Sequence, residues 1–229
     1  MDMNLPQLAP AVGQAVGAAT AHLDTTQLVA MAAALGWASG LRLYAVVFLT
    51  GLAGFMGWVP LPAGLQVLQH PAVMGVAGVM LLVEFLADKI PLVDSLWDTV
   101  HTFIRIPAGA ALAAGVMGAD AGSWQTIAAL MGGTLAATSH VAKTTTRAAV
   151  NTSPEPFSNI ALSLLGDAAV PGMLWLSFNH PATFFIVLTV VLVAMVVLTA
   201  VLFKFVRGML RKLQSKFGPR IERAQGAGE

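Results

Sequence analysis

The sequence predicts an all-α fold, a polytopic membrane helix bundle of about six transmembrane helices, several of them kinked or interrupted. Of its 229 residues 57% are hydrophobic and only 10% are charged, whereas an ordinary soluble domain has about 25% charged residues. The mean hydropathy is +0.77. Apolar stretches that approach the roughly 20 residues needed to cross a bilayer recur along the chain, separated by Pro- and Gly-rich breaks.

Composition divides the chain into three parts. Residues 1–25 form a loose N-terminal lead without Lys or Arg, residues 26–207 a six-helix membrane domain, and residues 208–229 a basic cytoplasmic tail. The start lacks the basic segment of a cleaved signal peptide. There is no cysteine, so disulfides and thiol chemistry are excluded.

The first apolar segment, residues 27–58, is longer than the membrane core at about 1.5 Å per residue, so it must tilt, bend or protrude. Gly36 and Gly40 have the spacing that permits close helix approach, and Arg42 follows them. A Pro/Gly-punctuated loop covers 59–71. The second segment, 72–88, is apolar until Glu84.

The third segment, residues 92–118, consists of two unlike halves. Asp94, Asp98, His101 and Arg105 recur at i, i+4, i+7 and i+11, which places them on one helix face. The apolar half after Pro107 is too short to cross a bilayer alone. The polar half must therefore also enter the membrane and face protein or water.

The remaining three segments extend this pattern. Residues 124–150 begin apolar and end with a polar face that carries His140, Lys143 and Arg147, whereas 157–178 is apolar apart from a few polar residues and Asp167. The last segment, 182–203, is uninterrupted and leads into the basic tail.

The distribution of charges predicts the topology. With the basic tail inside, six spans put both termini in the cytoplasm and satisfy the positive-inside rule. Every polar half-helix then lies on the cytoplasmic side of a bacterial inner membrane. Arg42 and Asp167 reach similar depths, so we expect them to form an ion pair at the floor of a cytoplasm-facing cavity.

Several motifs together resemble one family. They are SGLR at 39–42, EFLADKIPLVDSLWDTVHTFIR at 84–105, PAGA at 107–110, and HVAK at 140–143 with Arg147. They resemble an uncharacterised bacterial family of polytopic membrane proteins catalogued as domain of unknown function 4126, over residues 30–195. The resemblance implies a helical membrane protein and supplies no activity. Ile106 stands where the family pattern has proline directly after the arginine.

Charged residues inside a membrane segment are costly unless paired or hydrated, and for that reason they mark functional sites. We expect a small permease or channel-like protein for an ion, proton or small polar solute. One alternative is a non-transporting scaffold or assembly partner whose charge network is structural. Another is a metal-dependent or lipid-modifying enzyme, although we expect no enzyme. The candidate pathway or binding residues are Arg42, Glu84, Asp88, Asp94, Asp98, His101, Arg105, His140, Lys143, Arg147 and Asp167.

Expectations about ligands and partners are few. If a metal binds, Asp94, Asp98 and His101 are its candidate ligands, because carboxylates one turn apart and a nearby imidazole can reach one cation. No cofactor and no nucleic-acid partner is expected. The bilayer is the main partner, with anionic lipid headgroups at the basic tail, and a homo-oligomer is compatible with the sequence.

Overall fold

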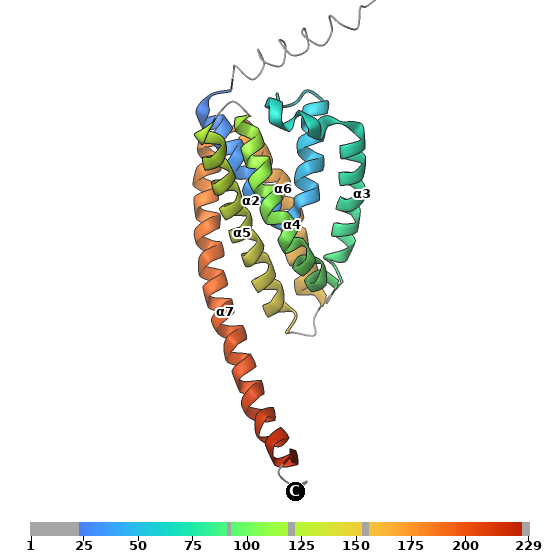
Figure 1. Ribbon diagram of the computed structural model, residues 1–229, viewed down its shortest axis with the longest axis vertical. Coiled ribbons are helices and arrows are strands. Elements are labelled where there is room, and N and C mark those ends of the chain that lie inside the picture. The colour runs from blue at the N-terminus through green and yellow to red at the C-terminus, as the bar shows by residue number, and fades with distance from the viewer. Residues whose placement is uncertain (1–22, 91–92, 119–121, 153–155, 226–229) are drawn as a thin grey trace, which may run out of the picture.

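The computed structural model describes residues 23–90, 93–118, 122–152 and 156–225, and this part of the chain is helical and contains no strand. The all-α prediction is therefore confirmed. Figure 1 shows the long helices side by side. The elements are α2 (Thr25–Phe55), the short 3-10 helix η1 (Ala63–Gln69), α3 (Pro71–Ala87), α4 (Val93–Met117), α5 (Ser123–Val150), α6 (Pro156–Asn179) and α7 (Pro181–Gln225).

Four helices in the described residues are long and apolar enough to cross a membrane: α2, α4, α6 and α7. A fifth span results if η1 and α3, which meet at an angle of 68°, are counted together. Helix α5 is less apolar because its second half is polar. The protein is therefore embedded in the membrane, but the expected count of six spans is not confirmed.

Helix α2 does not run straight through the bundle. At Arg42 the backbone leaves the helical region (φ −146°, ψ 74°). Before this break, Gly36 packs on Gly132, and Gly40 packs on Ala136 and Ser139 of α5. Residue numbers rise together along the two helices, so the first half of α2 runs parallel to α5.

After the break the direction reverses. Phe48 contacts Gly78, and Gly51 packs against Leu68 and Met74, so this half runs antiparallel to α3. Helices α3 and α5 point the same way because α4 returns between them. Both ends of α2 therefore lie at one end of the bundle (Figure 1), and Arg42, at the turn between the two halves, is buried.

This reversal corrects the expectation that 27–58 is one crossing segment. The start of α2 lies at the end of the bundle opposite to the basic part of α7 (Figure 1). Two cytoplasmic termini require an even number of crossings, and the structure gives no support for that topology. Residues 1–22, which include the N-terminus itself, lie outside the described residues.

The first half of α2 is the core of the bundle. Its residues from Ala30 to Leu43 are all buried. Small side chains permit this burial: a Cβ on Gly36 would lie 2.5 Å from the Cα of Gly132. The weak GxxxG signal therefore marks a true close contact.

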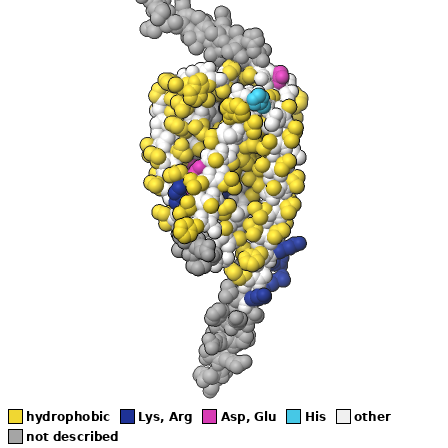
Figure 2. Space-filling model, turned by 180° about the vertical axis from the view of Figure 1, so that it is seen from behind, with side chains coloured by type: hydrophobic (Ala, Val, Ile, Leu, Met, Phe, Trp, Pro, Cys, Tyr) yellow, Lys and Arg dark blue, Asp and Glu magenta, His cyan; other side chains and the backbone are white. Residues whose placement is uncertain are grey.

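Helix α7 is the opposite case. Its apolar side chains are largely exposed, among them Val190, Val193, Val197 and Val201. The helix continues beyond the bundle to Gln225 without interruption (Figure 1). Figure 2 shows basic side chains gathered where α7 leaves the apolar wall, as expected for a helix that faces lipid and ends at a membrane surface.

Candidate functional site: a charge network around the break of α2

The break of α2 frees backbone carbonyls that a continuous helix would satisfy. Polar side chains of α5 meet them. Ser139 donates a hydrogen bond from Oγ to the Trp37 carbonyl (2.6 Å), and Lys143 donates from Nζ to the Leu41 carbonyl (3.0 Å). A cation at this point is also favoured by the negative end of the half-helix dipole. The polar face of α5 thus holds the turn in place.

Arg42, at the turn itself, is buried and connects α2 to two other helices. It forms an ion pair with Asp88, and its Nη2 lies 2.9 Å from Oδ1 of Asp167. The same Nη2 donates to the hydroxyl (2.9 Å) and carbonyl (3.1 Å) oxygens of Ser163. The expected Arg42–Asp167 pair is confirmed. Asp167 has a second cation, Lys89, at 3.4 Å.

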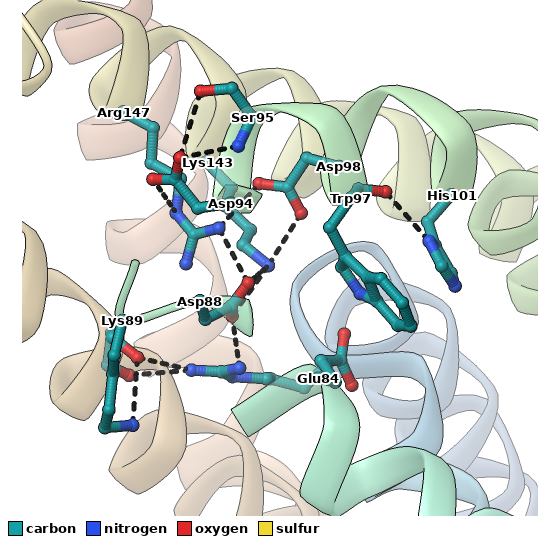
Figure 3. A network of polar contacts seen from close by, with 12 residues as sticks. Glu84, Asp88, Lys89, Asp94, Ser95, Trp97, Asp98, His101, Lys143 and Arg147 are labelled. Carbon is teal, nitrogen blue, oxygen red and sulfur yellow. Dashed lines mark hydrogen bonds and ion pairs between the residues drawn. The ribbon is translucent and has the colours of Figure 1, made fainter. Parts of the chain in front are cut away.

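Asp88 and Asp98 share two cations at the centre of the network (Figure 3). Lys143 lies 3.2 Å from Asp88 and 3.0 Å from Asp98, and Arg147 lies 2.7 Å and 2.8 Å from the same two carboxylates. Acids from α4 and the α3–α4 turn thus alternate with bases from α5. All four side chains are largely shielded from solvent.

Asp88 follows directly after the last residue of α3. Burial alone would raise the pKa of its carboxyl, but the charges of Lys143, Arg147 and Arg42 outweigh that effect and hold the pKa well below its usual range. Asp88 is therefore ionised, and the cations around it stay paired.

Arg105 closes the inner end of the network. Its two terminal nitrogens lie 2.6 Å from Asp98 and 2.5 Å from Glu84. Both Arg105 and Glu84 are completely buried. A buried ion pair of this kind requires nearly ideal geometry, because each unpaired charge would cost several kcal/mol.

Asp94 lies at the outer end and is held mainly by neutral donors. The backbone N–H of Ser95 donates to it at 2.6 Å, the amide of Asn151 donates at 3.3 Å, and the Nε of Arg147 lies at 3.9 Å. Asp94 thereby ties the start of α4 to the end of α5.

The two histidines have different surroundings. His140 lies 2.7 Å from the Thr102 hydroxyl and 3.5 Å from Arg105, beside the network. His101 turns away from the acids, as Figure 3 shows, and stacks on Trp97 at 4.0 Å. Its ring nitrogens lie near the Trp97 carbonyl (2.8 Å) and the Tyr44 hydroxyl (3.2 Å).

A metal site at Asp94, Asp98 and His101 is not formed, because both acids are occupied by donors and the imidazole faces elsewhere. Within the ranges that the structure describes, no group of three His, Asp or Glu side chains is arranged to hold a metal ion.

A cavity of about 730 Å³ adjoins the network between α2, α5, α6 and α7. Its polar border consists of Arg42, Lys143, Arg147 and Ser163, together with the hydroxyl of Thr146, and the remaining walls are apolar. No acid of the network lines it. The network therefore presents its positive side to this cavity.

The sequence-predicted residues converge more closely than spacing alone could show. Each of ten of these eleven residues contacts at least one other of the ten, and His101 stands apart. Partners without an assigned role in the sequence analysis include Tyr44, Trp97, Thr102, Asn151 and Ser163. Asn151 and Ser163 carried a signal as polar residues directly after and within apolar segments.

The fold and the site together define an all-helical integral membrane protein with a charge network inside its bundle. The chain belongs to the family described as Domain of unknown function (DUF4126), whose model matches residues 28–200. This confirms the resemblance drawn from the motifs. No curated protein matches the chain, and no solved structure matches it.

Proposed function

We propose that the protein is a small permease that moves an ion, proton or small polar solute, with the charge network as its binding and coupling site. The observation that supports this most is the break in α2, which brings Arg42 to acids on α6 and at the end of α3. Interrupted helices that end at charged groups inside the bilayer mark substrate sites in many transporters. Ionisable residues at this depth are costly to keep without a function.

The shared pairing at the centre suggests how coupling would work. Lys143 and Arg147 each contact both Asp88 and Asp98. An incoming anion could take over one of these cations, and a carboxylate that loses its cation could then take up a proton. Proton and solute would then stabilise the same open arrangement, as required for a coupled carrier.

We propose the following orientation in a bacterial inner membrane. Helices α3 to α7 cross the bilayer, and α2 enters and leaves at the external side. The exposed basic residues Lys204, Arg207, Arg211 and Lys212 then lie at the cytoplasmic surface, where anionic lipid headgroups attract them. The polar ends of α3, α4 and α5 lie on this same side.

Flux measurements test the permease directly. Purified protein in liposomes is given a pH gradient with panels of cations, anions and small polar solutes, and compared with Asp98→Asn. We expect protein-dependent flux for at least one panel member and its loss in Asp98→Asn. Asp24→Asn is the matched control, because Asp24 is exposed and remote from the network and asparagine also caps a helix well. Absence of flux throughout, or equal flux in Asp98→Asn, would contradict the proposal.

The second candidate is a non-transporting scaffold, and the complete burial of the inner end of the network favours it. Glu84 and Arg105 are fully buried and paired at 2.5 Å, which is the geometry of a structural ion pair. A scaffold predicts that Asp98→Asn lowers the free energy of unfolding while neither protein shows flux. The same set of samples therefore separates the two candidates.

A further inference from the structure

We propose that the cavity between α2, α5, α6 and α7 binds an amphiphile with a single hydrocarbon chain and an anionic carboxylate or phosphate-monoester head, which enters from the lipid phase. This inference goes beyond solute transport, since binding in the cavity requires no flux.

The size and the walls of the cavity suit such a molecule. Its volume of about 730 Å³ falls in the range of roughly 300–1,000 Å³ that small-molecule sites have. The walls above the charged end are apolar and come from α6 and α7, with Met173, Val187 and Val191 among the residues. A flexible chain can follow such walls without leaving a polar group unsatisfied.

The cavity opens toward the surrounding lipid. Two of its lining residues, Leu165 and Trp175 on α6, are 66% and 56% exposed, so the cavity is not sealed from the surroundings of the bundle. In a membrane that apolar surface faces acyl chains, so the molecules with direct access are those dissolved in the bilayer.

Charge complementarity selects an anionic head. Arg42, Lys143 and Arg147 border the cavity with the hydroxyl of Ser163, while the acids that pair with these cations lie behind them. Arginine donors match carboxylate and phosphate oxygens well. A neutral head would gain less at this end, and a cationic head would be repelled.

An unsatisfied donor adds a second observation. Trp37 lines the cavity and is only 1% exposed, and its indole Nε1–H has no hydrogen-bond acceptor among the described residues. A buried donor without a partner costs free energy, and a bound ligand with an oxygen-bearing head can supply the missing acceptor.

The cavity also has the orientation of a lipid. Its cationic end lies near the end of α5 and the start of α6, at the end of the bundle where the basic part of α7 emerges (Figure 1). Its apolar walls continue toward Trp175 and Val187. An amphiphile from the leaflet on the basic side can therefore enter with its head and chain already in the bound direction.

The test uses the full chain in nanodiscs of neutral phospholipid. Stearate brominated at mid-chain is the probe, because bromine quenches tryptophan fluorescence on contact and Trp37 and Trp175 both line the cavity. Stearyl phosphate and stearyl alcohol, brominated at the same positions, test the two anionic heads and the neutral head.

We expect saturable quenching by stearate or stearyl phosphate at low mole fraction, and only the shallow, linear quenching of a bulk lipid by the alcohol. Saturation by one anion and not the other identifies the head. Quenching by the alcohol equal to that by both anions would overturn the proposal.

Two cavity-filling variants sharpen the test. Gly172 lines the cavity, and no side chain or other helix lies within 4 Å of the place where its Cβ would stand, so the side chain of Gly172→Leu starts in open space. It should raise the mole fraction for half-maximal quenching about tenfold, equivalent to roughly 1.4 kcal/mol. Ala194→Phe fills the α7 wall and should act likewise.

Gly75→Leu on α3 is the matched control, because Gly75 has equally open surroundings but does not line the cavity. It should bind as the unmodified chain does. Unchanged quenching in both Gly172→Leu and Ala194→Phe would contradict the site. Since quenching is measured without any gradient, a chain that binds stearate but shows no flux refutes the permease alone.

Discussion

Arg105 and Arg42 are both buried arginines that pair with two carboxylates, but their surroundings differ. Arg105 and its partner Glu84 have no exposed surface at all. Arg42 borders a cavity, and its partner Asp167 is 22% exposed. We infer that the two ends have different roles. The buried end around Arg105 fixes the packing of α3 against α4, and the charged groups of the open end around Arg42 can exchange partners.

The difference has an energetic consequence. A fully buried charge that loses its partner has no water or other ion to pair with. The full cost of its desolvation therefore lowers the free energy of unfolding. At the open end around Arg42, a charge without its partner can instead be stabilised by water, by Lys89 or by the head of a ligand. The same substitution should therefore cost progressively less from the Arg105 end to the Lys89 end.

The largest effect is expected for Arg105→Met. It leaves Glu84 without its cation and removes one of the cations of Asp98, and should lower the free energy of unfolding by about 3–5 kcal/mol. Denaturant titration in a fixed detergent measures this. Adding Glu84→Gln to Arg105→Met should recover part of the loss, since it neutralises the stranded acid. A loss below about 1 kcal/mol would place this end among exposed ion pairs.

An intermediate effect is expected for the coupling between Arg42 and Asp167. Because Ser163 and Asp88 also hold Arg42, a double-mutant cycle with Arg42→Met and Asp167→Asn should give a coupling energy of about 1–2 kcal/mol. The equivalent cycle on Arg105 and Glu84 should give a larger value. Equal coupling at both ends would remove the distinction between them.

The smallest effect is expected for Lys89→Gln. Lys89 is 23% exposed and lies 3.4 Å from Asp167, so the change should cost about 0–1 kcal/mol, as for partly solvated pairs. The contribution of the Lys89–Asp167 pair to the free energy of unfolding should fall as salt is added, whereas that of the buried Arg105 pairs should not change. A salt-independent loss of several kcal/mol would show that this end is sealed too.

Much of the site follows from the sequence because charge inside an apolar chain must be paired. The spacing of Asp94, Asp98 and Arg105 predicted one buried face of α4, and the structure places all three in the network. The Arg42–Asp167 pair followed from depth alone. The sequence could not predict which base pairs with which acid, because the pairs join residues up to 125 positions apart. The pairing also depends on how each helix is rotated about its axis.

The reversal of α2 could not be read from hydropathy. Both halves are apolar, and hydropathy carries no information about direction. No proline marks the break at Arg42. What stabilises it is distant in sequence, namely the donors Ser139 and Lys143 on α5 and the acid Asp88. His101 was misleading for a related reason, since it shares the face of the acids but Tyr44, on the returning half of α2, provides its partner.

The central claim is that α2 turns back at Arg42 and so delivers a charge into the bundle. The chain has no native cysteine, so single cysteines can report its topology without background. Thr25→Cys and Met56→Cys lie at the two ends of α2, and Arg207→Cys lies on the basic part of α7; all three positions are exposed. A membrane-impermeant maleimide should label Thr25→Cys and Met56→Cys from the same side and Arg207→Cys from the other side. Labelling of Thr25→Cys and Met56→Cys from opposite sides would show that α2 crosses the membrane and would contradict the account.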